Sequence, residues 1–299
     1  MPIFVLDMNF LQTEELKERL QSDLTTRYVL PDVALVEMCK NADWQLTMKL
    51  ATGVLYNHTE RLKVSLSVGE ALTIELRRLV PLRGEDFLSD SFAKKVAYLI
   101  QTLNEDHSKI DTELETEMTA AREALLKEEL NADEAKTRTK TLLELLNKGL
   151  NPAVIKALRA PGLKHESLIA FAYETAHAYS WHLLTTKHGM PDSDAIEYLD
   201  LRPLILRYQF LLVRNCFVHI RNGIDIASYK ASNELNNQLD LDFALIASYF
   251  DDLLSKDLNL VKSYADLKCV IKTQRSELTM AANAWLIELG LINSDGSIV

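Results

Sequence analysis

The chain has 299 residues, of which 47% are hydrophobic and 25% are charged, and its formal net charge is −10. This composition is ordinary for a globular protein, and it excludes a disordered chain that has too few apolar residues to form a core. The negative net charge argues against a surface coated in basic residues for non-specific nucleic-acid binding, although it is compatible with one local basic groove.

The cysteines and the N-terminus indicate the compartment. Cys39, Cys216 and Cys269 are few and have no CxxC spacing, so neither a disulfide framework nor a zinc site is indicated. The first residues lack a basic segment followed by a long apolar one, and no uninterrupted apolar stretch reaches about 18 residues. We therefore expect a cytoplasmic protein that is neither secreted nor inserted in a membrane.

Short apolar runs near the N-terminus predict strands that alternate with helices. "IFVL" at Ile3–Leu6 contains β-branched and aromatic residues, which is typical of a strand buried on both faces of a parallel sheet. "YVLP" and "RLKVSLSV" predict two further strands, at 28–31 and 61–68. Helices are expected after these strands, over 13–21, from Val33, and over 69–79.

The middle of the chain is rich in helix-forming residues. From about Asp86 to Asp200 the sequence contains long amphipathic windows such as "DSFAKKVAYLIQTLNE" and "ADEAKTRTKTLLELLNKGL". We interpret 86–200 as a helical insertion between an N-terminal part, 1–85, and a C-terminal part, 201–299, of one α/β domain.

The last hundred or so residues are expected to resume the α/β pattern. "RPLILRYQFLLVRNCFVHIRNG" predicts a long helix that ends at Gly223, because glycine is favoured just after a helix. A helix from about Asp240 to Phe250, a short strand at Leu253–Ser255 and a helix from Leu258 are expected to follow.

Four acids are expected at one edge of the sheet, because the carboxyl ends of parallel strands and the amino ends of the following helices share an edge. Asp7 and Asp257 follow strands, Glu37 lies in the early turns of a helix, and Asp240 begins one. Asp7 alone could simply start a turn or cap the next helix. Four carboxylates close together would repel one another, and a divalent cation would relieve that repulsion. Oxygen ligands without Cys or His favour Mg²⁺ or Mn²⁺.

At these residues the sequence resembles the PIN domain nucleases. The resemblance rests on "VLDMN", "LPDVALVE" and "DLDFALIASYFDDLLSKD". It implies a three-layer α/β/α PIN-like fold with a central parallel sheet and, in this chain, a large α-helical insertion. It also implies that Asp7, Glu37, Asp240 and Asp257 bind the metal, with Asn9 and Ser255 in support. Asp242 is an alternative to Asp240 as the third acid.

The resemblance further implies a function. The family's members are metal-dependent ribonucleases, often toxins or RNA-processing enzymes, so we expect an endoribonuclease that hydrolyses RNA phosphodiester bonds with Mg²⁺ or Mn²⁺, possible roles being a toxin or a defence effector. The helical insertion would select the substrate, bind a protein partner or mediate self-association. The alternative within this fold is a non-catalytic binding or regulatory protein.

A second constellation indicates a different chemistry. "RNCFVH" places Arg214 and His219 at the R-x4-H spacing of HEPN ribonucleases, which cut RNA without a metal, and Asn215 matches the polar residue that often follows their Arg. On a helix this apolar, the same residues could instead be packing or surface groups. Arg207, Arg214 and Arg221 recur every seven residues and could form one basic stripe or a plain solvated face. "ETAH" has the E-x-x-H spacing of a di-iron ligand pair, but we find no second copy.

Overall fold

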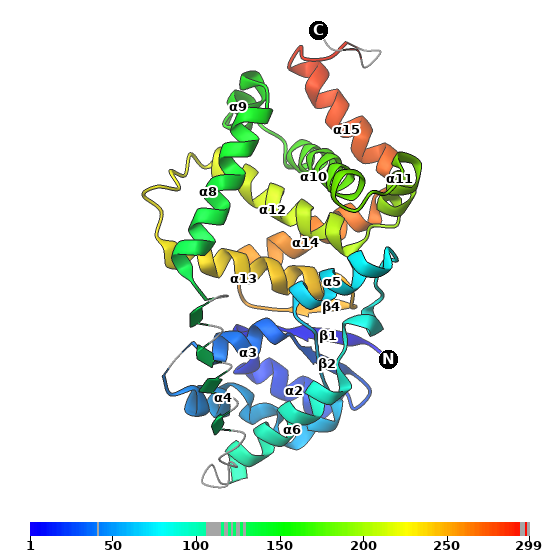
Figure 1. Cartoon of the computed structure of the whole chain (residues 1–299). Coiled ribbons are helices and arrows are strands. Elements are labelled where there is room, and N and C mark those ends of the chain that lie inside the picture. Colours follow the sequence, from blue (N-terminus) through cyan, green and yellow to red (C-terminus); the bar gives the residue numbers. More distant parts are fainter. Residues whose placement is uncertain are drawn as a thin grey trace. The chain divides into compact units, whose positions relative to one another are not determined.

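A small parallel β-sheet lies within a mostly helical chain (Figure 1). The computed structural model describes residues 1–40, 42–105, 115–116, 119–120, 122–123, 126–127, 130–293 and 297. The sheet has four strands in the order β3-β2-β1-β4, and every pairing is parallel. The strands are β1 (Ile3–Leu6), β2 (Arg27–Leu30), β3 (Leu62–Val64) and β4 (Asp252–Leu254). The expected mixed α/β class with a parallel sheet is confirmed.

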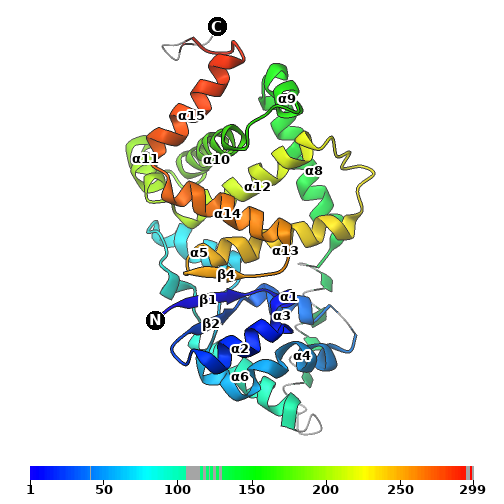
Figure 2. The same ribbon diagram turned by 180° about the vertical axis from the view of Figure 1, so that it is seen from behind.

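The apolar runs form strands because their side chains fill the core on the sheet faces. Val5 and Leu6 are fully buried, as are Val29 and Leu30 of the neighbouring strand. In the register of the sheet Val5 lies opposite Val29 and Leu6 lies opposite Leu254. The first and last strands of the chain are therefore neighbours, and their carboxyl ends meet (Figures 1 and 2).

The helices follow the predicted alternation in the first third of the chain. Thr13 caps α2 by accepting a hydrogen bond from the Leu16 N–H at 3.2 Å, as its position before the amphipathic run suggests. The helices of this part are α1 (Met8–Leu11), α2 (Glu14–Ser22), α3 (Asp32–Met38), α4 (Trp44–Thr52), η1 (Gly53–Arg61), α5 (Val68–Arg78), η2 (Gly84–Phe87) and α6 (Asp90–Glu105).

Apart from β4, the remaining elements of the described chain are helices joined by turns and loops. Gly223 adopts φ +62° just after a long helix, which is the left-handed conformation predicted there. The remaining helices are α8 (Ala132–Gly149), α9 (Pro152–Leu158), α10 (His165–Lys187), α11 (Asp192–Asp200), α12 (Leu204–Arg221), α13 (Ala231–Ala247), α14 (Leu258–Lys272) and α15 (Arg275–Glu288).

The chain divides into two compact units, and their boundaries differ from the expected ones at residues 85 and 200. The α/β unit comprises Met1–Ala71, Leu82–Asn131 and Asp242–Tyr264, and the helical unit comprises Leu72–Pro81, Ala132–Leu241 and Ala265–Val299. The reason is packing: α6 lies against β3 and η1, whereas α12 lies against α10. The start of the expected insertion therefore groups with the sheet, and much of the expected C-terminal part groups with the helices.

Two expected elements have different lengths. The strand expected over 61–68 is limited to Leu62–Val64, followed by an isolated bridge between Ser65 and Leu88. The helix expected from Asp240 begins nine residues earlier, at Ala231. Its polar first half is stabilised by tertiary contacts, because the fully buried Glu234 accepts hydrogen bonds from Thr139 Oγ1 at 2.5 Å and, with the ring protonated at this nitrogen, from His219 Nε2 at 3.0 Å.

A buried carboxylate starts the long helix α12. Glu75 is fully buried and accepts hydrogen bonds from the backbone N–H groups of Leu204 and Ile205, at 2.9 and 3.0 Å. Both N–H groups lie in the first turn of the helix, where no intrahelical acceptor exists and a negative charge is favoured. The Glu75 carboxylate thus caps this helix from another segment, because the side chain of Pro203, at the N-cap position, has no hydrogen-bond acceptor.

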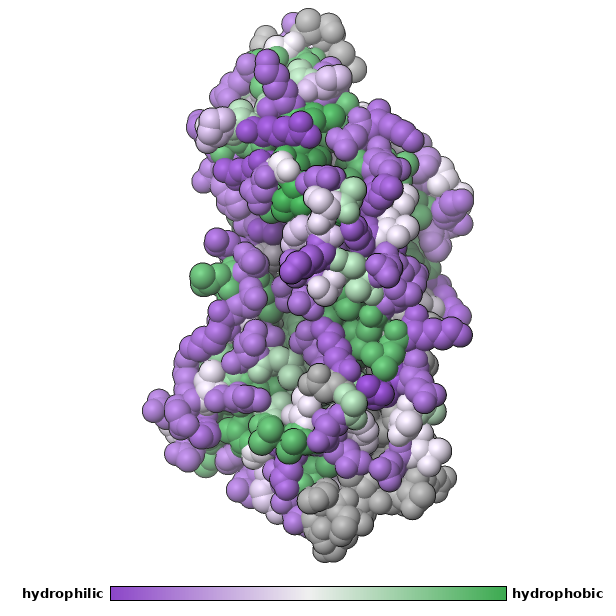
Figure 3. All heavy atoms as spheres, turned by 90° about the vertical axis from the view of Figure 1, so that its left-hand side faces the viewer, coloured by the Kyte–Doolittle hydropathy of each residue, from purple (hydrophilic) through white to green (hydrophobic). Residues whose placement is uncertain are grey.

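The surface is largely hydrophilic on the face that Figure 3 draws, with hydrophobic side chains in separate patches between the polar ones. Among the helices in the described ranges, none is both long enough and apolar enough to cross a lipid bilayer.

Candidate functional site at the carboxyl edge of the sheet

Asp7 is a buried acid directly after β1. Its backbone N–H donates to Leu254 O at 3.0 Å, which extends the pairing of β1 with β4 by one residue. Only 3% of its surface is exposed, and its carboxylate makes no capping hydrogen bond to α1. Burial raises the pKa of Asp7, and the like charge of Asp257 adds to this, while a hydrogen bond from Ser255 opposes it. Asp7 occupies the N-cap position of α1, and the backbone N–H groups of Met8 and Asn9 also oppose the rise in its pKa.

Ser255 and Asp257 follow β4 and lie beside Asp7. Ser255 Oγ donates to Asp7 Oδ2 at 2.6 Å and accepts from the Asp257 N–H at 2.9 Å. Asp257 Oδ1 accepts from the N–H groups of Asn259 and Leu260 at 2.7 and 3.0 Å, so this acid also caps α14. One hydroxyl therefore links the two acids that follow the neighbouring strands.

Glu37 lies in the last turn of the short helix α3 rather than in the early turns of a longer one. Burial raises its pKa, the charge of Asp7 adds to this, and Lys40 opposes it. Lys40 Nζ lies 3.3 Å from Glu37 Oε1. The charge of Asp7 is thus the smallest of the contributions to the raised pKa of Glu37, and Lys40 is the cationic partner of this acid.

The remaining expected residues lie elsewhere in their elements. Asp240 and Asp242 are interior residues of α13, so neither begins that helix as the sequence led us to expect; Asp240 belongs to the helical unit and Asp242 to the α/β unit. Asn9 is exposed on α1. The structure thus brings together Asp7, Ser255 and Asp257 by hydrogen bonds, while Glu37 is linked to them only through the effect of the Asp7 charge on its pKa; we call these four residues the carboxyl edge.

The carboxyl edge fits a hard cation in its chemistry, since its donors are oxygens and Asp7 is a buried acid with acidic neighbours. Over the described ranges, no three His, Cys, Asp or Glu side chains are grouped closely enough to hold a metal ion. Ser255 and Lys40 instead occupy one oxygen each of Asp7 and Glu37. In the part of the chain that the structure describes, the acids of the carboxyl edge thus supply oxygen ligands of the right type without the grouping that would hold an ion.

The R-x4-H pair is used in two buried contacts of the helical unit. Arg214 is 8% exposed, and its Nη2 lies 2.8 Å from Asp266 Oδ2. His219 is 3% exposed, with Nε2 at 3.0 Å from Glu234 Oε2. Both side chains thus serve as packing groups, which was one of the two interpretations open from the sequence.

The expected basic stripe is also explained by contacts within the helical unit. Arg207 Nε donates to Arg202 O at 2.8 Å, and Arg221 Nη2 donates to Leu163 O at 3.5 Å. With Arg214 on Asp266, all three arginines of the heptad spacing attach α12 to neighbouring segments. The stripe is therefore neither a plain solvated face nor a free basic surface.

The E-x-x-H pair has separate structural roles. Glu174 Oε1 accepts from Thr279 Oγ1 at 2.6 Å, which connects α10 with α15. His177 is 6% exposed, and burial lowers its pKa from 6.5 to about 4, with a smaller contribution from Arg275. The histidine is therefore neutral in the folded chain at pH 7.

We expect His177 to make the protein acid-sensitive. The unfolded chain binds a proton near pH 6.5 and the folded chain only near pH 4, so stability present above pH 6.5 is lost as the pH falls through this window. The loss should amount to about 3 kcal/mol, since one pKa unit corresponds to about 1.4 kcal/mol. Urea unfolding between pH 4 and 8 should show a shallower acid limb for His177→Leu than for the parent. The exposed His182→Leu serves as control, and equal acid limbs in all three proteins would contradict the assignment.

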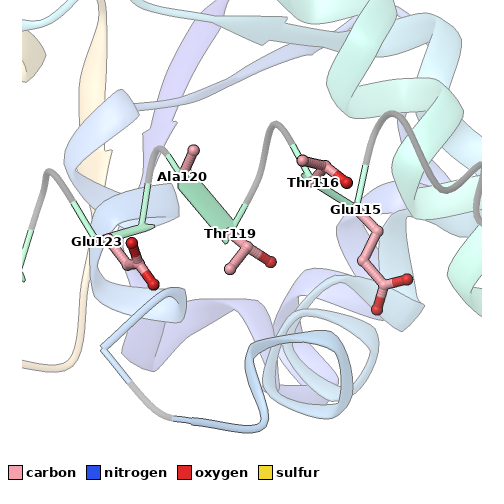
Figure 4. A pocket seen from close by; sticks show the side chains of 5 residues that line it. All are labelled: Glu115, Thr116, Thr119, Ala120 and Glu123. Carbon is pink, nitrogen blue, oxygen red and sulfur yellow. The ribbon is translucent and has the colours of Figure 1, made fainter.

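A surface hollow of about 410 Å³ is lined by residues that are distant in sequence from the expected acids. Its walls are formed by Glu115, Thr116, Thr119, Ala120 and Glu123, which come from one stretch of the α/β unit (Figure 4). None of the residues of the carboxyl edge lines it. We therefore do not assign the expected chemistry to this hollow.

Lys40 is the residue of the site that the sequence interpretation missed. Its signal was the i,i+3 spacing from Glu37 in "EMCK", since residues three apart on a helix are neighbours. Helical periodicity alone does not indicate the pair, because Lys40 lies after the end of α3 at Met38.

Comparison of the chain with protein-family models, with curated proteins and with solved structures finds no match. The function is accordingly inferred from the chemistry of the carboxyl edge.

Proposed function

We propose that the chain is a Mg²⁺- or Mn²⁺-dependent endoribonuclease with a PIN-like, three-layer α/β/α arrangement. The observation that carries the proposal is the buried Asp7 at the end of β1, hydrogen-bonded to Ser255 just after β4, with the charge of Asp257 contributing to its raised pKa and its own charge contributing to the raised pKa of Glu37. A protein gains nothing in stability by burying an acid among like charges, so such an arrangement favours a functional role.

In this proposal Asp7, Glu37 and Asp257 would hold the ion, with Asp242, the alternative third acid, as a further ligand from the same α/β unit. The ion would orient and activate water for in-line attack on an RNA phosphodiester and stabilise the leaving oxygen. Ser255 fixes the orientation of Asp7, and the cap of α14 fixes Asp257. Asn9, which is exposed on α1, is available to substrate.

Other parts of the proposal follow from the same chemistry. The three cysteines are free thiols, which suits the cytoplasm, where RNA substrates are present. We assign the helices outside the sheet to substrate selection, a protein partner or self-association. A non-catalytic regulatory protein with this fold is the competing function, and it would bind RNA or a partner without cutting.

Metal dependence is the test of this function. We expect EDTA to stop RNA cleavage and added Mn²⁺ or Mg²⁺ to restore it, because the proposed chemistry needs the ion. The measurement is cleavage of labelled RNA by purified protein, with and without chelator. Cleavage that persists in EDTA would favour the Arg214 and His219 mechanism, and a metal-binding protein without cleavage would favour the regulatory function.

A further inference from the structure

A run of positive charge lies in the helical unit of this acidic chain. Over 145–165 the sequence contains four lysines or arginines and no Asp or Glu, although the net charge of the whole chain is −10. The four cations are Lys148, Lys156, Arg159 and Lys164, and we call them the basic segment. All four are exposed, and over the described ranges none of them forms an ion pair with an acid. Their charge is therefore available to a ligand.

The basic segment is carried by three helices that share one support. Lys148 lies in the last turn of α8, and Lys164 occupies the N-cap position of α10. Between them, Lys156 and Arg159 lie at the end of α9, which follows α8 and leads directly into α10 (Figures 1 and 2). All three helices pack on α12. The four cations thus belong to consecutive helix ends of one packed assembly.

Contacts within the helical unit fix the turn between α9 and α10. Leu158, at the end of α9, is fully buried. The carbonyl oxygen of Leu163 accepts from Arg221 Nη2 at 3.5 Å, and His165 Nε2 lies 2.7 Å from Asp266 Oδ1. The backbone that carries the cations is therefore held in place before a ligand binds, which reduces the entropy lost on binding.

The chemistry of the basic segment favours a phosphate backbone as its ligand. Exposed cations neutralise phosphates and release their counterions, and this release drives the binding of nucleic acids. An anionic membrane also attracts cations, but a helix that lies on a membrane presents large apolar side chains next to them. Over 146–165, all of which the structure describes, no large apolar side chain is exposed, and Val154 and Leu158 of α9 are buried. Nucleic acid is therefore the better fit.

We propose that the basic segment binds the phosphate backbone of RNA and so holds the substrate of this chain. The inference rests on the proposed function for the choice of RNA, but it does not require a metal ion at the carboxyl edge. Contacts to phosphates carry no base information, so binding here is independent of RNA sequence. In a chain whose net charge is −10, a local basic surface also directs a polyanion to one part of the molecule.

The test is RNA binding in EDTA, measured by fluorescence anisotropy with a labelled single-stranded RNA of about 15 nucleotides. The double variant Arg159→Gln with Lys164→Gln removes two cations of the basic segment. At about 0.1 M salt it should bind RNA roughly twentyfold more weakly than the parent. The slope of log affinity against log salt should be smaller by about 1.4, since each contact to a single strand contributes about 0.7.

The matched control is the double variant Lys94→Gln with Lys95→Gln. Both lysines are exposed on α6, so the control makes the same change in net charge outside the basic segment. It should stay within about twofold of the parent, because salt screens exposed charges that do not contact the RNA. Circular dichroism of each variant shows that the affinities refer to folded protein.

The outcomes separate this inference from the proposed function. A parent that cleaves RNA, with a basic-segment variant that binds RNA as tightly as the parent, would overturn the inference alone. Equal losses in both double variants would also overturn it, because binding would then follow net charge and not the basic segment. RNA binding that depends on the basic segment in a protein that never cleaves would support the inference and contradict the proposed cleavage. A parent that binds phosphatidylserine vesicles and no RNA would overturn the inference in favour of a membrane surface.

Discussion

Asp7→Asn is expected to abolish RNA cleavage while leaving the fold intact and, without added metal, more stable than the parent. The amide keeps the shape of the carboxylate and can still accept the Ser255 hydroxyl, so the packing at the end of β1 is preserved. Activity should fall by at least about a hundredfold, because even residues that only orient metal ligands typically contribute 10–100-fold. The measurement is cleavage rate per folded protein, with the exposed Asp192→Asn on α11 as control.

The stability of Asp7→Asn should depend on pH in a defined direction. Because the folded chain raises the pKa of Asp7 above 3.8, ionisation of this acid opposes folding as the pH rises above that value, and the penalty is absent below it. The variant lacks this penalty, so its advantage in the free energy of unfolding should be largest near neutral pH and vanish below about pH 4. Mn²⁺ should stabilise the parent and not the variant, since only binding to the folded state raises stability. Equal cleavage by both proteins would remove Asp7 from the mechanism.

The strands were predictable because they are short continuous apolar runs that the core requires. β1, β2 and β4 appear within one or two residues of their predicted positions, and the acids that follow β1 and β4 meet as the geometry of parallel strands requires. Local sequence therefore contained the information for both the sheet and the Asp7–Ser255–Asp257 contact. Apolar periodicity does not describe local turns. It therefore could not predict that Asn9 is exposed or that Lys40 follows the end of α3 beside Glu37.

The start of α13 could not be predicted from local sequence. "ASNELNNQL" is polar and contains weak helix formers, so it looks like a loop before a helix that starts at an Asp. Its helical conformation is stabilised by residues distant in sequence, because Glu234 binds Thr139 and His219. The structural role of Arg214 was likewise not predictable from local sequence, because its partner Asp266 lies 52 residues further along the chain. Whether a charged residue belongs to a site or to the core depended in both cases on a tertiary partner.

The boundary between the two units was hidden for a related reason. Amphipathic periodicity predicts that α6 has an apolar face, and this is correct, since Val96, Leu99 and Leu103 are buried. It does not say which surface that face will cover. The face packs with β3 and η1, so a helix that looked like the beginning of an insertion belongs to the α/β unit.

Asp266→Ala is expected to destabilise the helical unit by roughly 3–5 kcal/mol, since it leaves a buried guanidinium without its partner. Arg214 Nε and Nη2 lie 2.9 and 2.8 Å from Asp266 Oδ2, and His165 Nε2 lies 2.7 Å from Oδ1. Urea unfolding measures the effect. Asp200→Ala is the matched control, because Asp200 pairs with Arg275 on the surface of the same unit and such a pair is worth only about 0–1 kcal/mol.

Replacing both partners separates the structural role of Arg214 from a catalytic one. The double variant Arg214→Met with Asp266→Leu should recover most of the lost stability, because two apolar side chains can fill the site of a buried ion pair without an unpaired charge. If Arg214 only packs α12 against α14, the folded double variant should retain Mn²⁺-dependent RNA cleavage at close to the parent's rate. Circular dichroism shows whether the double variant is folded. If the folded double variant does not cleave RNA and the parent's activity survives EDTA, a catalytic role for Arg214 and His219 would be favoured. A single variant Asp266→Ala no less stable than Asp200→Ala would instead show that the buried pair contributes no more than an exposed one.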